Sequence, residues 1–279
     1  MRIDAHQHYW RYAQEGYEWM GERNILKQDY LPAHSLPYLR ENGLAGTVAI
    51  QARHTLEEND FLIELSKTND FVKGVVGWVN LCAANVSDVI AQYQEDLCGI
   101  RHLIHDETDI DFMLQAEFTN GISQLESSGL TYDLLIRTQH LENATKLIDQ
   151  FPHQPFVIDH IAKPFISREI PDNTWATGMR ALAERENVYC KLSGMVTEAD
   201  YNEWGDDEIP LELFLPYMDL VLENFTPART MFGSDWPVCT LAATYDEVYD
   251  IVNERLVTLS KDEQSDIMGD TATRFYGLS

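Results

Sequence analysis

Two short segments near opposite ends of the chain carry the side chains best suited to chemistry. His6 and His8 are separated by one residue near the start, and Asp235 follows an apolar run near the end. Because side chains alternate faces along a β-strand, two histidines with this spacing project to the same side. Two imidazoles and one carboxylate can together bind a divalent cation. We therefore predict one site built from both ends of the chain.

A third histidine, His160, extends this site. It stands at the end of another apolar run, where the neighbouring Asp159 should point to the opposite face. We expect a metal site formed by His6, His8, His160 and Asp235, and we expect Asp235 and His160 to be catalytic. Asp235 would act as the general base that takes a proton from the attacking water, which a bound cation would make more acidic.

Basic and aromatic side chains at other strand ends are candidates for binding a ligand. Arginine in such a position usually pairs with an internal carboxylate or binds a ligand oxygen. The expected substrate-binding residues are Arg53, His54, Arg101, His102, Lys163, Lys191, Trp10, Trp78 and Trp236. Periodicity leaves open whether Arg101 or His102 points inward, and Lys191 could instead form an internal ion pair with Asp133. The residues predicted to lie on the surface are His34, His105, His140 and His153.

Eight β-rich apolar runs must position these residues. They are Arg2–His8, Gly46–Ala52, Lys73–Asn80, Gly99–Ile104, Thr131–Arg137, Pro155–Ile161, Val188–Ser193 and Thr230–Asp235. Helical patterns such as Thr55–Thr68 and Leu211–Asn224 alternate with them, which indicates a parallel sheet. First and last strands become neighbours only when a sheet closes on itself. The sequence therefore predicts a single (β/α)8 TIM barrel that forms one domain over residues 1–279.

The connections that follow the strands are longer than those that follow the helices, and barrel active sites are built from the former. The first of them, Tyr9–Pro32, is rich in aromatic residues. It could be a lid that excludes water from a sugar-sized ligand or a hydrophobic plug over the barrel mouth, and the sequence favours neither. The acidic run Glu203–Glu208 is expected to be a solvated loop, and Ser260–Ser279 a closing helix packed on the barrel.

Composition restricts the class of protein. The formal net charge of −26 would repel nucleic acid and anionic lipid, and no apolar run is long enough to span a membrane. Because the first strand follows directly after Met1, we expect no secretion signal and a cytoplasmic location. The four cysteines are scattered and should be reduced thiols, and a homo-oligomer remains open. The chain has no glycine-rich phosphate loop or nucleophile elbow, which argues against kinases, dehydrogenases and serine hydrolases.

Several of these segments together resemble the amidohydrolase-2 family. They are Asp4–Trp10, Gln51–Thr55, Val76–Leu81, Gly99–His102, Val157–Pro164, Lys191–Gly194 and Phe232–Pro237, and the likeness covers nearly the whole chain. More narrowly, they are similar to its branch of sugar-lactone lactonases, which act on L-fuconolactone, L-rhamnonolactone and related aldonolactones.

The resemblance implies a catalytic divalent metal, with zinc as the expected ion, bound by His6, His8, His160 and Asp235. Family members rich in metal add a lysine, glutamate or second histidine on other strands, where this chain has Arg101, Asp133 and Lys191. One ion is therefore expected rather than two. Because some relatives work without a tightly bound metal, the alternative is that Arg53, Arg101 or His102 polarises the substrate carbonyl directly.

The function expected from the resemblance is hydrolysis of a small-molecule sugar lactone, an aldono- or aldarolactone, to its acid. The basic residues would bind ring hydroxyls, and the tryptophans would cover the apolar ring face. A decarboxylase or a lactone isomerase on the same scaffold is the alternative. A non-catalytic sugar-binding barrel would not need the convergent histidines and aspartate.

Overall fold

The computed structural model describes residues 1–168, 171–200, 204 and 209–279, and its core is one sheet of eight parallel strands in sequence order. The strands are β1 (Ile3–Gln7), β2 (Gly46–Ile50), β3 (Val72–Gly77), β4 (Gly99–His102), β5 (Thr131–Leu134), β6 (Phe156–Ile158), β7 (Val188–Leu192) and β8 (Thr230–Phe232). Each overlaps one predicted run and ends before that run does. The predicted residues beyond each strand belong to the turns at the carboxyl ends of the strands.

The sheet closes between its first and last strands, which confirms the predicted (β/α)8 barrel. Asp235 donates its backbone N–H to the carbonyl of His6 at 2.9 Å, and His8 donates its backbone N–H to the carbonyl of Trp236 at 2.7 Å. Both bonds lie at the carboxyl ends of β1 and β8. The seam of the barrel is therefore formed by the backbone of the predicted site residues.

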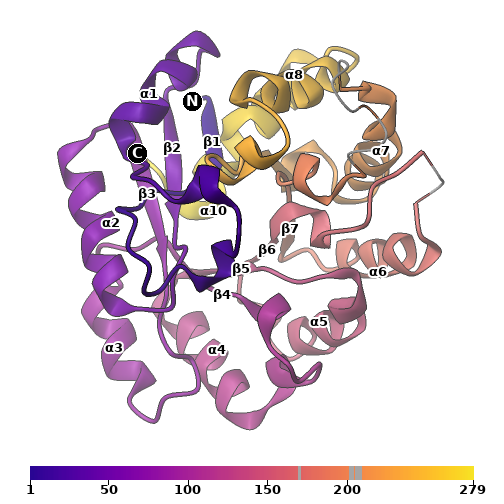
Figure 1. Cartoon of the computed structure of the whole chain (residues 1–279). Helices are drawn as coiled ribbons and strands as arrows, with labels where there is room; N and C mark the ends of the chain where they lie inside the picture. Colours follow the sequence, from indigo (N-terminus) through magenta and orange to yellow (C-terminus); the bar gives the residue numbers. More distant parts are fainter. Residues whose placement is uncertain (169–170, 201–203, 205–208) are drawn as a thin grey trace.

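Helices cover the outside of the barrel (Figure 1). They are α1 (Pro32–Glu41), α2 (Leu56–Thr68), α3 (Val86–Tyr93), α4 (Ala116–Ser128), α5 (Leu141–Ile148), α6 (Asn173–Ala183), α7 (Leu215–Phe225) and α8 (Tyr245–Leu256). Helix α2 begins as predicted, with Thr55 Oγ1 accepting the N–H of Glu58 at 3.3 Å. Predicted helix Leu211–Asn224 begins instead with a 3₁₀ turn, Leu211–Leu213, before α7. In the described part of the chain, no helix has the length and hydrophobicity needed to cross a membrane.

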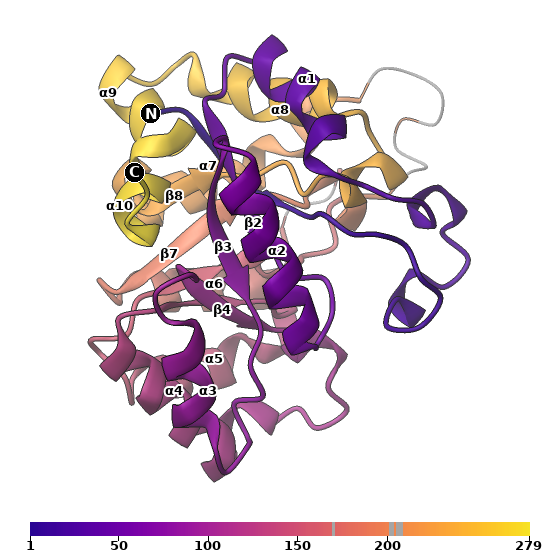
Figure 2. The same cartoon turned by 90° about the vertical axis from the view of Figure 1, so that its left-hand side faces the viewer.

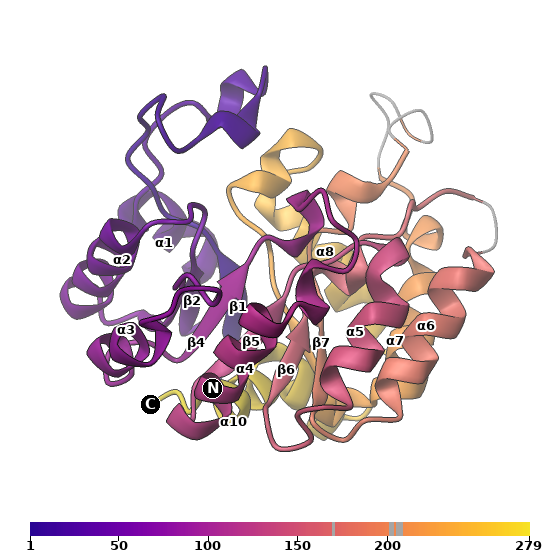
Figure 3. The same ribbon diagram turned by 90° about the horizontal axis from the view of Figure 1, so that it is seen from below.

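The C-terminal segment seals the amino end of the barrel. It consists of α9 (Lys261–Ser265), a π-helical turn (Asp266–Asp270) and α10 (Thr271–Tyr276), so the expected single closing helix is wrong. Tyr276 and Phe275 pack with apolar side chains inside the barrel, including Ile3, Val48 and Val157. Figure 3 shows α10 at the end of the barrel opposite the long N-terminal loop.

That loop, residues 8–31, connects β1 to α1 and extends away from the barrel (Figure 2). Trp10 is fully buried within it and meets Tyr17, Trp19 and Tyr30 at ring-centroid distances of 5.4–6.0 Å. The indole N–H of Trp10 is bonded to the carbonyl of Gln28 at 2.9 Å. The aromatic residues therefore form a small core that holds the loop in shape. The predicted acidic loop Glu203–Glu208 lies outside the described residues, apart from Trp204.

Candidate active site

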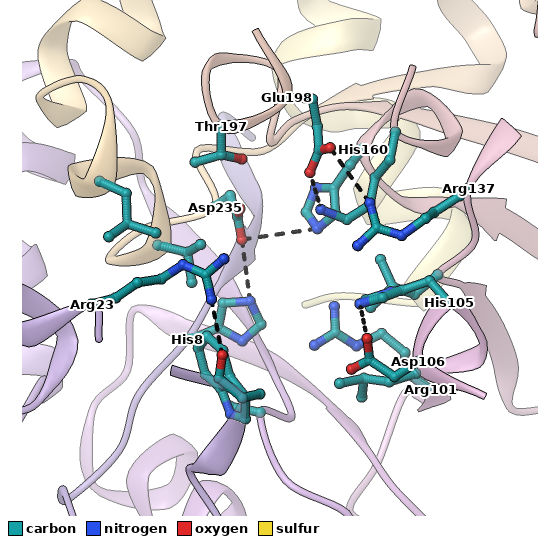
Figure 4. A pocket seen from close by; sticks show the side chains of 17 residues that line it. His8, Arg23, Arg101, His105, Asp106, Arg137, His160, Thr197, Glu198 and Asp235 are labelled. Carbon is teal, nitrogen blue, oxygen red and sulfur yellow. Dashed lines mark hydrogen bonds and ion pairs between the residues drawn. The ribbon is translucent and has the colours of Figure 1, made fainter. Parts of the chain in front are cut away.

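A cavity of about 630 Å³ opens at the carboxyl ends of the strands (Figure 4). We call its buried polar residues the floor: His8, Arg101, His160 and Asp235. We call the more accessible polar and aromatic residues contributed by the loops the rim: Trp19, Arg23, His105, Asp106, Arg137, Lys163, Thr197 and Glu198. Apolar side chains, among them Leu103, Leu135, Val238 and Leu241, complete the wall. A cavity of this size and mixed lining suits a small polar ligand.

The structure brings the predicted metal residues together. Asp235 Oδ1 lies 3.2 Å from His8 Nε2 and 3.6 Å from His6 Nε2, and these two nitrogens are 3.2 Å apart. His160 Nε2 is 3.9 Å from the same carboxylate oxygen. His6, His8 and Asp235 thus form a compact group of three, and His160 stands beside it on the aspartate side.

The orientation of the two histidine rings suits a cation. His8 Nδ1 lies 2.9 Å from the carbonyl of Ile50, which can only accept, so Nδ1 carries the proton and Nε2 presents a lone pair. That lone pair faces Asp235 Oδ1, and the ring of His6 also directs Nε2 toward both atoms. Electron-rich atoms at such distances repel one another unless a proton or a cation lies between them. The donor set of His6, His8 and Asp235 therefore fits one divalent ion.

An unusual backbone turn places His160. After β6 the four residues His160–Lys163 all have positive φ, between 48° and 60°, which is rare outside glycine and costly for Ile161. Neighbours hold the turn: Trp175 Nε1 donates to the carbonyl of Ile161 at 2.7 Å, and Ser193 Oγ lies 2.9 Å from His160 Nδ1. A Cβ on Gly194 would come within 2.5 Å of His160 Nδ1, so only glycine leaves room for this ring.

Asp4 connects the strands that carry His6 and Asp235. Its Oδ1 accepts the backbone N–H groups of His6 and Ser234 at 3.1 and 2.9 Å, and its Oδ2 accepts from Gln7 Nε2 and the Tyr245 hydroxyl at 2.8 and 2.9 Å. The register of β1 against β2 shifts between Asp4 and Gln7, which adds one residue to β1. This bulge lets Asp4 and Gln7 meet each other while the two histidines face the cavity side.

A buried group of charges lies directly beneath His6. Lys191 Nζ is 2.5 Å from Asp133 Oδ2 and 2.9 Å from Asp159 Oδ1, and Arg101 Nη1 is 3.1 Å from Asp159 Oδ2. The alternative of an internal Lys191–Asp133 ion pair is therefore confirmed, and the predicted outward orientation of Asp159 is wrong. Strand β6 ends at Ile158, and the turn that follows abandons strand alternation, so both Asp159 and His160 face inward.

The environment keeps His6 and His160 neutral and Asp235 charged. Burial lowers the pKa of His6 and that of His160 well below their usual values. Burial raises the pKa of Asp235, but His160 and His8 beside it bring the pKa below the ordinary value. Neutral imidazole and ionised carboxylate are the forms that bind a metal and accept a proton.

Several residues predicted to bind substrate do not line the cavity, because their side chains pack elsewhere. Trp10 and Lys191 are fully buried, and Trp236 packs edge-on against Tyr30 at 5.2 Å. The other displaced residues are Arg53, over the ring of Tyr17, and the stack of His54, Trp78 and His102. Arg101 and Lys163 do line the cavity, so at the end of β4 it is Arg101 that faces inward.

The rim contains residues that the sequence did not indicate. His105 lines the cavity and His140 is buried, so their predicted surface location is wrong, whereas His34 and His153 are exposed as predicted. The unpredicted lining residues include Trp19, Arg23, Arg137, Thr197 and Glu198. Glu198 pairs with Lys163 and lies 3.8 Å from Arg137. In the sequence these residues have the appearance of ordinary loop residues, and only their position after a strand hints at a role.

The site combines an HxH pair at the end of β1, a histidine after β6 and an aspartate after β8. A model of the amidohydrolase family (Amidohydro_2) matches residues 3–278, and the chain belongs to this family. This confirms the resemblance seen in the sequence.

Two curated proteins and one crystal structure are similar to the chain over most of its length. The chain is 37% identical to an L-fucono-1,5-lactonase of Burkholderia multivorans, over all of this chain and 96% of that protein. It is 33% identical to an L-fucono-1,5-lactonase of Burkholderia ambifaria, over 88% and 83% of the two chains. A crystal structure of a Burkholderia multivorans amidohydrolase with bound zinc superimposes with a TM-score of 0.94 at 36% identity, covering both chains completely.

Proposed function

We propose that this protein is a hydrolase that opens a sugar lactone, such as L-fucono- or L-rhamnonolactone, to the sugar acid. The observation that carries the proposal is the position of Asp235: a buried carboxylate on the cavity floor, 3.2 Å from His8 Nε2, with a pKa below the ordinary value. Such a carboxylate can take a proton from water within the cavity. The similarity to two L-fucono-1,5-lactonases supports this reaction, and so does a partial match, 27% identical over 52% of the chain, to an L-rhamnono-gamma-lactonase of Scheffersomyces stipitis.

One divalent ion, with zinc as the candidate, completes the site. His6, His8 and Asp235 would hold it, with His160 as the fourth ligand, and the zinc in the similar Burkholderia multivorans structure supports that choice. When bound, the ion supplies Lewis acidity and makes the nearby water easier to deprotonate. The internal Lys191 ammonium, 3.2 Å from His6 Nδ1, would repel a second cation on that side of His6.

The proposed hydrolysis uses the charges of the floor. Asp235 takes a proton from water as the water oxygen bonds to the lactone carbonyl carbon. Arg101 lines the cavity with a guanidinium that Asp159 and Gln51 hold in place, so it can donate to the carbonyl oxygen as negative charge develops. When the bond to the ring oxygen breaks, that oxygen takes the proton from Asp235. The products are the free carboxylic acid, which ionises, and the released hydroxyl.

The residues on the rim would bind the sugar hydroxyls. Lys163 and Arg137 offer donors, Glu198 and Thr197 offer acceptors, and the Trp19 ring can cover an apolar ring face. These roles replace those expected for the residues that do not line the cavity.

The test is a pH-indicator screen of the purified, zinc-loaded protein against aldono- and aldarolactones of both hand series. Each turnover releases one proton, so hydrolysis of a sugar lactone at rates far above the spontaneous reaction is the expected result. No activity on any lactone, together with release of carbon dioxide from an aromatic acid, would reject the lactonase in favour of a decarboxylase. A lactone isomerase would convert one ring form to another without releasing a proton.

A further inference from the structure

A short turn in the long N-terminal loop carries two residues of the rim. It is the 3₁₀ turn Glu18–Met20, and Trp19 within it and Arg23 shortly after it line the cavity (Figure 4). Arg23 Nη1 donates to the backbone carbonyl of Trp19 at 2.9 Å, which ties the two together. The base of the loop is closed by Trp10 and Tyr30, which exchange backbone hydrogen bonds at 2.8 and 2.9 Å. The turn is distant from this base along the chain, so other contacts have to hold it at the cavity.

Arg53, which follows β2 on the barrel, contacts the residues just before this turn. Its guanidinium carbon lies 5.0 Å from the centre of the Tyr17 ring, within the range of a cation–π interaction. A Cβ on Gly16 would come within 2.8 Å of Arg53 Cδ, so the backbone of the loop rests directly on the arginine stem. Gly16 also has a φ of 83°, which glycine adopts without strain. Arg53 therefore contacts the loop with both its stem and its charge.

Glu58, in the first turn of α2, fixes the barrel side of this contact. Its carboxylate accepts the backbone N–H groups of Ala52 and Arg53 at 3.1 and 2.5 Å, and its Oε2 lies 4.0 Å from Arg53 Nε. The side chain of Glu58 is 1% exposed and that of Arg53 is 23% exposed. A cation–π contact is stronger where water is largely excluded. Arg53 is thus held against Tyr17 by the barrel, and it is not among the residues that line the cavity.

Tyr17 connects Arg53 to the rim. The Tyr17 ring is 4% exposed and lies 5.9 Å from the ring of Trp10, which in turn lies 6.0 Å from the ring of Trp19. Because Trp10 is fully buried, these rings form a continuous packed path from the barrel to the cavity. A loss of the contact at Tyr17 would therefore reach Trp19.

From these contacts we infer that Arg53 is a positioning residue, which holds the N-terminal loop so that Trp19 and Arg23 face the substrate. It acts on the ligand through Tyr17 and the loop, in place of the direct contact that the sequence predicted for it. The effect on substrate binding rests on the proposed function. The effect on the loop does not, because it concerns contacts within the protein alone.

The first test needs no substrate. Amide hydrogen exchange of the full-length protein, followed by mass spectrometry, measures opening of the turn, in which the N–H groups of Met20, Gly21 and Arg23 are hydrogen-bonded to nearby carbonyls. In Arg53→Ala these amides should exchange about 5–30-fold faster, because a largely desolvated cation–π contact and its packing are lost. The amides at the base of the loop should exchange as before. Unchanged exchange in the turn would overturn the inference, whatever the protein does to lactones.

Two further variants serve as controls for the first test. Arg11 belongs to the same loop and lies 6.0 Å from the centre of the Phe61 ring, but it is exposed, so Arg11→Ala should change exchange in the turn less than about twofold. Arg53→Lys keeps a cation near Tyr17 and should accelerate exchange less than Arg53→Ala does. Equal acceleration in Arg11→Ala and Arg53→Ala would contradict a particular role of Arg53. If Arg53→Ala does not fold, Arg53→Gln, which keeps part of the stem without the charge, takes its place.

The second test separates positioning from direct binding. On the lactone found in the screen, Arg53→Ala should raise KM about threefold to tenfold and change kcat less than about twofold. Because Arg53 and Trp19 act through the same loop, Arg53→Ala combined with Trp19→Ala should raise KM by less than the product of the two single effects. The full product, or a higher KM without faster exchange, would mean that Arg53 binds the substrate directly and would overturn the inference. Faster exchange in a protein that hydrolyses no lactone would support the role of Arg53 in the loop and reject the proposed function alone.

Discussion

The floor and the rim of the cavity are built on different principles. The floor residues follow the strands, are almost completely buried, and each has a second partner that fixes its orientation, such as Ile50 for His8 and Ser193 for His160. The rim residues come from loops, and Arg137 retains 46% of its side-chain exposure. Preorganised groups at the floor suit bond making and breaking, and accessible groups at the rim suit ligand selection. Changes to the floor should therefore reduce turnover, and changes to the rim should alter binding.

The largest effect is expected at Asp235. In Asp235→Asn the base is lost while the shape is kept, so kcat should fall roughly 10³-fold. The measurement is kcat on the lactone found in the screen, with circular dichroism to verify folding. The matched control is Asp106→Asn, a carboxylate on the rim, where an exposed ion pair contributes about 1 kcal/mol or less, so kcat/KM should change less than about fivefold. Equal losses of activity in Asp235→Asn and Asp106→Asn would contradict the proposal that floor residues contribute more to turnover than rim residues.

The next effect is expected at Arg101. Arg101→Lys keeps the charge but loses the forked donor that Asp159 and Gln51 orient, and kcat should fall about 10²-fold. Arg137→Lys is the control, since Arg137 also lines the cavity but is half exposed. Its effect should be confined to KM. A larger loss of kcat in Arg137→Lys than in Arg101→Lys would mean that Arg137, on the rim, donates to the lactone carbonyl oxygen instead of Arg101.

A smaller effect concerns stability in acid. The folded pKa values of His6 and His160 lie below that of free histidine, so below about pH 6.5 the unfolded chain binds protons that the folded protein does not. Stability is complete above pH 6.5 and is lost as pH falls toward the folded pKa values. Between pH 7 and 5.5 the loss should be about 1 kcal/mol for each of the two histidines.

Denaturant unfolding of metal-free protein at both pH values measures this loss. His160→Gln should make unfolding less dependent on pH. His153→Gln, which removes an exposed histidine, should leave the pH dependence as it is. A stability that rises on acidification would mean that His6 and His160 are protonated in the folded protein.

The smallest effect is expected at Trp19. Removing an aromatic surface that covers roughly 40 Å² of an apolar ring face weakens binding by about 1 kcal/mol, so Trp19→Ala should raise KM about fivefold with little change in kcat. Trp78→Ala is the control, because Trp78 stacks on His54 and does not line the cavity. A change of KM in Trp78→Ala but not in Trp19→Ala would support the predicted contact between Trp78 and the substrate.

Much of the barrel and the cluster of His6, His8, His160 and Asp235 could be predicted because both follow regular patterns. Strand periodicity located eight strands, and a site shared by His6 and Asp235 required closure of the sheet. Asp159 was misplaced because a left-handed turn replaces the strand at Ile158, and no period signals such a turn. The rim was missed for a related reason. Arg137 and Glu198 have no recurring spacing, and their position depends on how the loops pack.

The tryptophans show a second reason why the sequence could not predict the whole site. Composition alone indicated an aromatic loop after β1, and the sequence could not distinguish a lid from a plug. In the structure Trp10 stabilises the loop from inside, while Trp19, T-shaped against it at 6.0 Å, lines the cavity. Burial of one ring and exposure of its neighbour depend on tertiary contacts that amino-acid type does not encode.

The hydrogen bonds of Asp4 have a consequence for folding during translation. Two of its four donors, the Ser234 backbone N–H and the Tyr245 hydroxyl, are more than 200 residues further along the chain. A ribosome translates from the N-terminus, so β1 and its histidines must wait for nearly the entire polypeptide before this carboxylate is satisfied. Until Asp235 has been synthesised, the nascent chain contains His6 and His8 but lacks the aspartate of the site. Synthesis that stops early would therefore leave a fragment without the proposed base, Asp235, and with Asp4 only partly hydrogen-bonded.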